Sequence, residues 1–254
     1  MTLHVQEYGS GHPLIILHGL FGSLDNWHTL SKIFSESFRV FAIDQRNHGH
    51  SPHSDVFTYD ALAEDLREFL DDRELKTAHV LGHSLGGKTA MQFALTFSDR
   101  VSKLVVVDMA PRAYPPVHDE IFDAMLPLDL STYSSRQQVD EAMAKKIQDL
   151  PTRQFLMKNL GRDESGGFRW KVNLEAIRRN YDEITRAIES EGTFTKPTLF
   201  VRGERSGYVR DSDVPGIRKL FPQAEILGLD TGHWIHAEAP QAFSRLVLEF
   251  LKRT

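Results

Sequence analysis

One serine lies between two glycines at the point where a short apolar run gives way to a helical pattern. The segment 82–86, Gly-His-Ser-Leu-Gly, follows the apolar stretch 78–81 and precedes helical spacing over 85–97. This is the G-x-S-x-G pattern, in which a serine occupies a sharp turn between a strand and a helix. Side chains at the glycines would collide in such a turn, and the helix N-terminus would favour negative charge beside the hydroxyl. The pattern predicts a nucleophile at Ser84.

Strands and helices alternate around this turn, which is typical of an α/β fold with a mostly parallel sheet and helices on both faces. Apolar runs predict strands at 3–8, 13–17, 39–43, 78–81, 101–107, 197–201 and 225–229. Helical spacing predicts helices at 27–35, 59–70, 85–97, 215–221 and 239–251.

Residues 111–195 interrupt this alternation. They contain apolar stripes at helical spacing, punctuated by proline and glycine, and no strong strand. We interpret them as an all-helical insertion, the helical cap, after the strand that ends at Asp108. The predicted domains are a core of residues 1–110 and 196–254 and a helical cap of residues 111–195. A length of 254 residues suits a single α/β domain with such an insertion.

The composition excludes several classes of function. The chain has no cysteine, which excludes disulfides, a cysteine nucleophile and thiolate metal sites, and suits the cytoplasm, where we expect the protein to work. The net charge is −5 and basic residues are interspersed with acidic ones, so no nucleic-acid partner is expected. We also expect no signal peptide and no membrane span, because the N-terminus is polar and no apolar run approaches ~20 residues. The sequence is compatible with a homodimer and does not determine the oligomeric state.

A serine nucleophile needs a base, and in this architecture the chain order is serine, acid, histidine. The base should follow the last predicted strand, where His233 lies. It would accept the Ser84 proton and return it to the leaving group. His236 is a nearby competitor, but Gly232 frees the backbone to present His233. We expect a structural or pocket-lining role for His236.

The acid must accept the other ring N–H of His233. A common place for it is the loop after strand 197–201, but this loop has no aspartate near Ser206. Asp108 ends the strand that we expect beside the serine turn, on the edge where such sheets bind ligands. We therefore assign Asp108 as the acid, with a turn-capping role as its alternative. The fallback acids are Glu204 and Asp211.

Two N–H donors must hold the oxyanion of the reaction. One is Leu85, which follows the nucleophile. The other should come from the glycine-containing loop 18–23, where we expect Leu20, with Phe21 as the second choice. A plain glycine turn is the alternative for this loop.

Aromatic side chains near these loops are candidates for substrate contact, and we predict that Phe21, Tyr208 and Trp234 bind substrate. A cap over a serine site must also exclude water. Some of its apolar residues should therefore face the site, from the candidates Phe122, Met125, Leu126, Phe155, Met157 and Tyr181.

The loop 44–51 contains Asp44, His48 and His50, which invites a metal interpretation. Two histidines without a further spaced ligand pair support it weakly, and we expect a structural role. The prediction is no metal and no cofactor.

Five segments carry a resemblance to a known family: 18–27, 44–51, 82–88, 107–111 and 232–238. The chain resembles the α/β-hydrolase superfamily over almost its whole length, and more closely the YbfF-type bacterial esterases, which are related to α/β-hydrolase domain-containing protein 11. The resemblance implies a serine–aspartate–histidine esterase with a helical cap, acting on short-chain esters and acyl-CoA thioesters. It also maps the acid to Asp108. The chain departs from the family at Glu204-Arg205 and Gly207, where Gly-Asn and Pro are expected, which leaves the contribution of that loop to the pocket open.

The leading hypothesis is a cofactor-free hydrolase of esters or acyl thioesters that acts through an acyl-enzyme. Acyl-CoA would need basic residues at the pocket mouth, and a solvated helix face is the alternative for the candidates Arg112, Lys158, Arg162, Arg178 and Arg179. Two other classes stay open: a perhydrolase or carbon–carbon bond hydrolase with the same triad, and a non-catalytic ligand-binding member of the superfamily. Haloalkane dehalogenases and epoxide hydrolases use aspartate at the position of Ser84, which argues against both.

Overall fold

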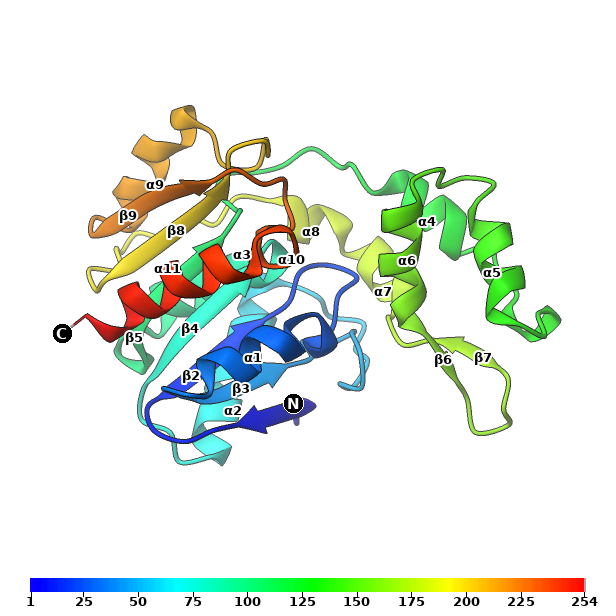
Figure 1. The fold of residues 1–254 in the computed structure, drawn as a ribbon, viewed down its shortest axis with the longest axis horizontal. Helices are drawn as coiled ribbons and strands as arrows, with labels where there is room; N and C mark the ends of the chain where they lie inside the picture. Colours follow the sequence, from blue (N-terminus) through cyan, green and yellow to red (C-terminus); the bar gives the residue numbers. More distant parts are fainter. Residues whose placement is uncertain (254) are drawn as a thin grey trace.

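The central sheet has seven strands in the order β1-β3-β2-β4-β5-β8-β9, and the computed structural model describes residues 1–253 (Figure 1). The strands are β1 Val5–Tyr8, β2 Pro13–Leu17, β3 Arg39–Ile43, β4 Ala78–His83, β5 Val101–Val107, β8 Thr198–Gly203 and β9 Ala224–Leu229. Only the edge strand β1 runs antiparallel to its neighbour among these strands. The predicted α/β class and mostly parallel sheet are confirmed.

Successive strand residues enter two separate hydrophobic clusters, because side chains alternate across a strand. In β2, Leu14 and Ile16 pack on one face, where α1 and α11 lie, and Ile15 and Leu17 pack on the other face, where α2 and α3 lie (Figure 1). These helices are α1 His28–Phe34, α2 Tyr59–Asp72, α3 Leu85–Thr96 and α11 Pro240–Lys252. Because both faces of the sheet are buried, the sequences of its strands are continuous apolar runs.

Shorter helices connect these elements. They are η1 Leu24–Trp27, η2 Ser98–Arg100, η5 Asp211–Asp213, α9 Val214–Leu220 and α10 Ile235–Glu238. Among residues 1–253 there is no helix with both the length and the apolar character needed to cross a membrane.

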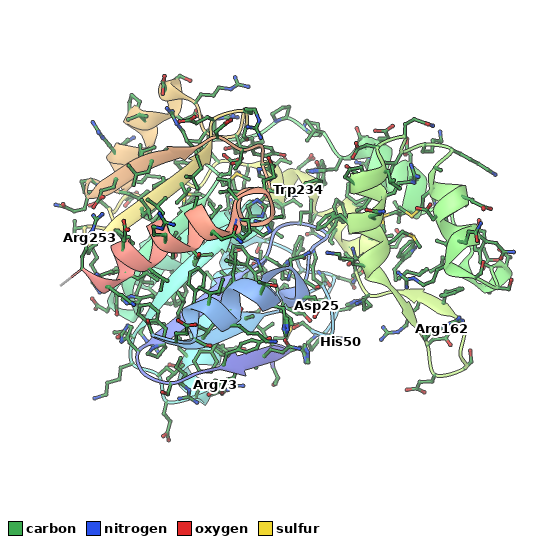
Figure 2. All side chains as sticks on the ribbon, viewed as in Figure 1. Asp25, His50, Arg73, Arg162, Trp234 and Arg253 are labelled. Atoms are coloured by element: carbon green, nitrogen blue, oxygen red, sulfur yellow. The ribbon has the colours of Figure 1, made fainter. Side chains whose placement is uncertain are left out.

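The segment between β5 and β8 leaves the sheet, and most of its elements lie at the right of Figure 1 and Figure 2, away from the sheet. It comprises α4 Asp119–Met125, η3 Leu130–Thr132, α5 Arg136–Met143, α6 Leu150–Leu156, η4 Met157–Asn159, β6 Leu160–Arg162, β7 Phe168–Trp170, α7 Leu174–Arg179 and α8 Tyr181–Thr185. The expectation of an all-helical insertion is wrong, because β6 and β7 pair as an antiparallel hairpin. Strands of three residues are too short to show an alternating pattern. The boundaries of the helical cap at 110/111 and 195/196 stay a prediction.

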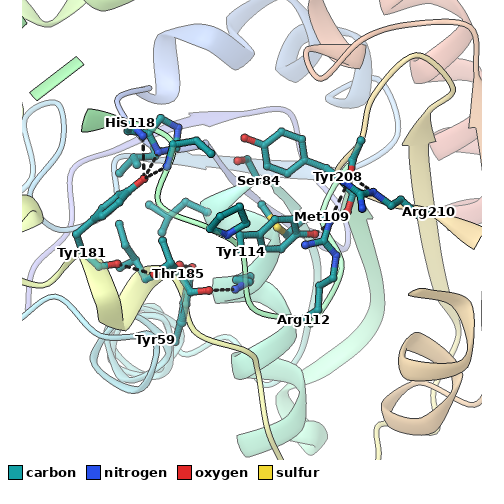
Figure 3. Close-up of a pocket in the computed structure, with 17 residues that line it drawn as sticks. Tyr59, Ser84, Met109, Arg112, Tyr114, His118, Tyr181, Thr185, Tyr208 and Arg210 are labelled. Carbon is teal, nitrogen blue, oxygen red and sulfur yellow. Dashed lines mark hydrogen bonds between the residues drawn. The ribbon is translucent and has the colours of Figure 1, made fainter. Parts of the chain in front are cut away.

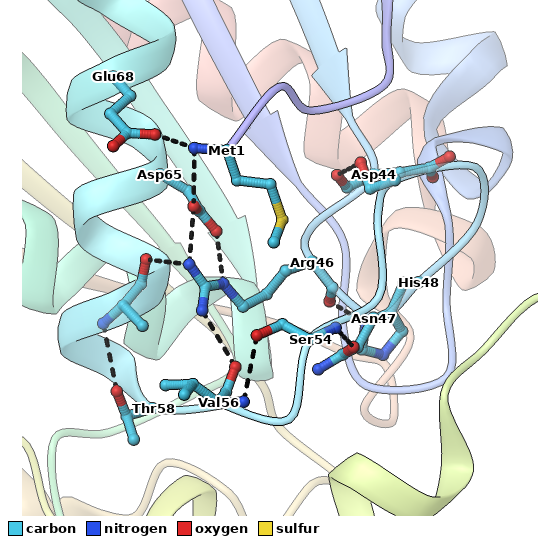
Figure 4. Close-up of polar contacts among 12 residues, drawn as sticks. Met1, Asp44, Arg46, Asn47, His48, Ser54, Val56, Thr58, Asp65 and Glu68 are labelled. Atoms are coloured by element: carbon cyan, nitrogen blue, oxygen red, sulfur yellow. Dashed lines mark hydrogen bonds and ion pairs between the residues drawn. The ribbon is translucent and has the colours of Figure 1, made fainter.

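A buried ion pair fixes the loop that follows β3 to helix α2 (Figure 4). Arg46 donates through Nε and Nη2 to the two carboxylate oxygens of Asp65, at 2.6 and 2.8 Å. Its remaining donors reach the carbonyls of Val56 and Ala61. The N-terminal amino group lies 3.6 Å from the same Asp65 carboxylate. The chain terminus, the loop and the helix are therefore joined at one charge centre.

We predict that Asp65→Asn destabilises the fold, because it leaves the Arg46 guanidinium buried without a counter-charge. The expected loss is about 3 kcal/mol of unfolding free energy, measured by urea denaturation. Asp71→Asn is the matched control on the same helix, since Asp71 pairs with Arg67 and Arg100 at the surface, and its effect should be much smaller. Equal effects of the two substitutions would contradict this role for the buried pair.

Candidate active site

Ser84 lies in a strained turn between β4 and α3. Its φ of 54° and ψ of −118° are unusual for a residue with a side chain. A Cβ on Gly82 would lie 2.0 Å from the Gly86 carbonyl oxygen, and one on Gly86 would lie 2.5 Å from that of Leu17. Only glycine fits at both positions. The turn thus has the strand–serine–helix geometry that the G-x-S-x-G pattern predicts, with the serine at the N-terminus of α3.

Asp108 follows β5 and is fully buried, and both of its carboxylate oxygens are engaged. The Gly203 amide donates to Oδ1 at 3.0 Å, and the Ser206 hydroxyl donates to Oδ2. His233 Nδ1 lies 2.7 Å from the same Oδ2. Gly203 ends β8, and Ser206 and His233 lie in the loops after β8 and β9, so segments that follow three neighbouring strands meet at this carboxylate. Its position is therefore fixed toward the His233 imidazole.

Two further contacts hold His233. The ring of Tyr208 stacks on the imidazole, with the ring centroids 3.9 Å apart and 17° between the planes. His83 Nε2 donates to the His233 carbonyl at 2.9 Å. Ser84 and His233 line the same cavity, and no hydrogen bond between their side chains is present within residues 1–253. Such bonds are often long in a free enzyme and shorten when substrate binds.

The alternative acids and base lie in other environments. Asp211 pairs with Arg202 at 2.5 Å on the surface, and the Glu204 side chain packs against Gly228. The His236 ring stacks on Trp27 at 4.5 Å, and burial lowers the pKa of His236 to about 3. Of the three acids considered from the sequence, Asp108 is thus the one that contacts His233. His236 packs against Trp27 and lines the cavity.

The loop after β2 is fixed through the peptide groups of Phe21. Its N–H donates to His48 Nε2 at 3.2 Å, and its carbonyl accepts from Asn159 Nδ2 at 2.7 Å. These two contacts hold Phe21 at a φ of 58°, which is uncommon for a bulky residue. Because the Phe21 N–H is occupied, it is a poor candidate for an oxyanion donor. The Leu20 and Leu85 amides donate to no acceptor in the part of the chain described.

The loop after β3 supports the loop after β2. Asp44 accepts from the Leu24 and His50 amides at 2.8 and 2.9 Å, and His18 Nε2 accepts from the Gln45 amide at 3.0 Å. These polar side chains are therefore hydrogen-bonded to other groups of the protein, which agrees with the structural role that the sequence predicts for this loop. Residues 1–253 contain no cluster of three or more acidic or histidine side chains placed to hold a metal ion.

Two cavities meet at Ser84. The Lys88 cavity has a volume of about 400 Å³ (Figure 3). Its lining includes Tyr59, Leu85, Lys88, Met109, Arg112, Tyr114, Pro115, Tyr181, Ile184 and Arg210. The His233 cavity has a volume of about 630 Å³. Its lining includes Phe21, His83, Phe155, Lys158, His233, Trp234 and His236. The two share Leu20, Ser84, His118 and Tyr208.

The predicted substrate-binding residues all line a cavity. Phe21 and Trp234 line the His233 cavity, and Tyr208 lines both. Of the six candidates in the predicted cap, Tyr181 lines the Lys88 cavity and Phe155 lines the His233 cavity. The other four, Phe122, Met125, Leu126 and Met157, line neither.

Several lining residues were not anticipated, including Lys88, Tyr114 and His118. The sequence could have placed Lys88 near the site, because it lies four residues after Ser84 on the predicted helix and therefore on the same face. Tyr114 and His118 precede α4 in a segment without a periodic pattern, so the sequence gives no signal for their position.

Comparisons with known proteins agree with this geometry. Residues 12–240 match the model of the alpha/beta hydrolase fold family. The chain is 38% identical over 253 residues to the sn-1-specific diacylglycerol lipase ABHD11 of Danio rerio, covering 96% of this chain and 80% of that protein. It is 36% identical over 250 residues to the esterase YbfF of Escherichia coli, covering 97% and 95%. The solved structure of a marine microorganism esterase is 40% identical, with a TM-score of 0.95 and 98% of each chain covered. The predicted resemblance is confirmed.

We predict that acid destabilises the protein through its buried histidines. Burial lowers the pKa of His18 to about 4 and that of His48 to about 3. Between pH 7 and 5 the unfolded chain therefore binds protons that the folded chain does not, so the free energy of unfolding decreases as the pH falls. Each such histidine should contribute about 2 kcal/mol over this interval, measured by urea denaturation at several pH values.

His48→Gln should weaken this pH dependence, because the amide binds no proton. His53→Gln, which removes an exposed histidine, is the control and should leave the dependence unchanged. The explanation fails if the His48 variant loses stability with acid as steeply as the unsubstituted protein.

Proposed function

The chain belongs to the α/β hydrolase family, among relatives that include esterases and a lipase, and from this premise we propose that it hydrolyses carboxylic esters through an acyl-enzyme. The observation that carries the proposal is the buried Asp108 carboxylate bound to His233, whose side chain lines a cavity together with the strained Ser84. A nucleophile, a base and an orienting acid in this arrangement are the parts that serine acyl transfer needs.

The proposed reaction follows from the two nitrogens of His233. Nδ1–H donates to Asp108, which leaves Nε2 to accept the Ser84 proton. Ser84 Oγ bonds to the ester carbonyl carbon, the bond from that carbon to the alcohol oxygen breaks, and His233 gives the proton to the departing alcohol. Water then loses a proton to His233 and attacks the acyl carbon, the bond to Ser84 Oγ breaks, and the proton returns to Ser84. The products are an alcohol and a carboxylic acid.

We assign the oxyanion to the amides of Leu20 and Leu85. Leu85 is the first residue of α3, so its N–H has no partner within the helix. Leu20 lies next to Phe21, whose peptide is fixed by His48 and Asn159. A fixed donor that needs no reorganisation is what stabilises a developing oxyanion.

The two cavities take different parts of the ester. His233 must reach the departing oxygen, and it lines only one of the two cavities. The alcohol therefore lies in the His233 cavity, and the acyl group lies in the Lys88 cavity. A volume of about 400 Å³ favours short or medium acyl groups there.

Acyl-CoA thioesters are the second candidate substrate class, because Lys158 lines the cavity that would take the leaving group. The other basic candidates support it less. Arg178 and Arg179 pair with Asp119 and Asp55, and Arg112 pairs with Asp213. The rate on an acyl-CoA relative to an ester of the same acid distinguishes the two classes. The cytoplasmic location stays a prediction.

We predict that a fluorophosphonate probe labels Ser84 and that Ser84→Ala abolishes both labelling and ester hydrolysis. Asp108→Asn should fold normally and reduce kcat by about 10³- to 10⁴-fold, because the imidazole loses its orienting acceptor. The readouts are intact-protein mass spectrometry and steady-state rates.

Asp211→Asn is the matched control and should keep nearly full activity, since Asp211 lies at the surface. The opposite result, an inactive Asp211 variant and an active Asp108 variant, would move the acid to the surface loop. Hydrolysis that persists in Ser84→Ala would reject the acyl-enzyme.

A further inference from the structure

Lys88 is a buried lysine in the cavity that we assign to the acyl group. Its side chain is 1% exposed, although lysine is rarely buried without a partner. It lies on α3 four residues after Ser84, and both residues line the Lys88 cavity. The cation is therefore close to the nucleophile but is no part of the proposed reaction.

Two carbonyl oxygens and two aromatic rings contact the Lys88 ammonium without neutralising its charge. Nζ donates to the carbonyls of Thr185 and Arg186. It also faces the rings of Tyr59 and Tyr114, at 5.5 and 5.0 Å from their centroids. Within residues 1–253 no carboxylate lies within ion-pair distance of this ammonium.

The two charged groups that act most on Lys88 are positive, and each is itself paired with a carboxylate: Arg112 with Asp213, and Arg186 with Asp60 and Glu183. Burial and the guanidinium groups of Arg112 and Arg186 lower the pKa of Lys88 to about 7. Arg112 lines the same cavity and lies over the Tyr114 ring, as Figure 3 shows. A buried charge without a counter-charge is costly, so an anion that entered this cavity would gain a favourable interaction.

The rest of the cavity suits a hydrocarbon chain. Met109, Pro115 and Ile184 line it together with Leu20 and Leu85. A ligand that extends from Ser84 into this cavity would contact both these apolar groups and Lys88. This combination of surfaces matches an acyl chain that carries a negative charge.

This inference rests on the proposed function. We propose that Lys88 binds a carboxylate at the far end of the acyl group, so that the preferred substrates are half-esters or half-thioesters of dicarboxylic acids. Lys88 is then a specificity-determining residue that acts at the end of the acyl group opposite to the reacting carbonyl.

The test compares anionic and neutral acyl groups of equal length. Monoethyl succinate, glutarate and adipate are each paired with ethyl butyrate, valerate and hexanoate, and hydrolysis is followed by acid release. At least one anionic ester should exceed its neutral partner in kcat/KM by about tenfold or more. A preference for the neutral ester at every length would overturn the proposal while leaving the esterase function intact.

Two substitutions separate the charge of Lys88 from a structural role. Lys88→Gln keeps N–H donors for the Thr185 and Arg186 carbonyls but has no charge, and Lys88→Met removes both. Each should reduce the anionic-to-neutral ratio of kcat/KM by about tenfold. Lys158→Gln, in the other cavity, is the matched control and should keep the ratio. An unchanged ratio in the Lys88 variants would refute the proposal.

A binding measurement tests the carboxylate site independently of ester hydrolysis. Glutarate should bind to Ser84→Ala, and not to Ser84→Ala with Lys88→Met, in calorimetric titrations. If no ester is hydrolysed but glutarate binds through Lys88, the proposed function fails and the carboxylate site stands. If esters are hydrolysed and glutarate binds equally to both proteins, the carboxylate site fails.

Discussion

The site depends on one buried carboxylate. Asp108 follows β5 and accepts hydrogen bonds from the Gly203 backbone N–H, the Ser206 hydroxyl and the His233 imidazole. A buried carboxylate needs such partners to remain in place, and here they come from strands far apart in the sequence. The same interactions that satisfy this charge therefore bring the base to the edge of the sheet where β4 presents Ser84. Folding of the sheet and assembly of the proposed triad are thus coupled.

The insertion contributes to the site as well as covering it. Asn159 of η4 donates to the Phe21 carbonyl, and His48 accepts from the Phe21 amide. This arrangement fixes the loop that carries Leu20 while leaving the Leu20 amide without a partner in the described chain. The insertion also supplies the Thr185 and Arg186 carbonyls that hold Lys88. The proposed oxyanion donor and the proposed selectivity for the acyl group therefore both depend on contacts between the insertion and the sheet.

Local constraints were predictable from the sequence, and long-range contacts were not. The strand 101–107 matches β5 because its β-branched run is long, and the turn at Ser84 follows from steric limits on Gly82 and Gly86. The assignment of Asp108 depended on the absence of an aspartate near Ser206; the serine there instead donates to Asp108. The β6–β7 hairpin and the neighbours of Lys88 were missed. The hairpin strands are too short for a pattern, and the Thr185 and Arg186 carbonyls that contact Lys88 are almost a hundred residues away.

The central claim is that Ser84, His233 and the Leu20 and Leu85 amides act on one tetrahedral centre. A crystal structure of the protein inhibited by an alkyl fluorophosphonate tests it most directly, because the adduct resembles that centre. The account predicts phosphorus on Ser84 Oγ, with its oxygen about 3 Å from the Leu20 and Leu85 nitrogens and its alkyl chain in the Lys88 cavity. An adduct whose oxygen lies away from both amides, or whose phosphorus is attached to another residue, would contradict it.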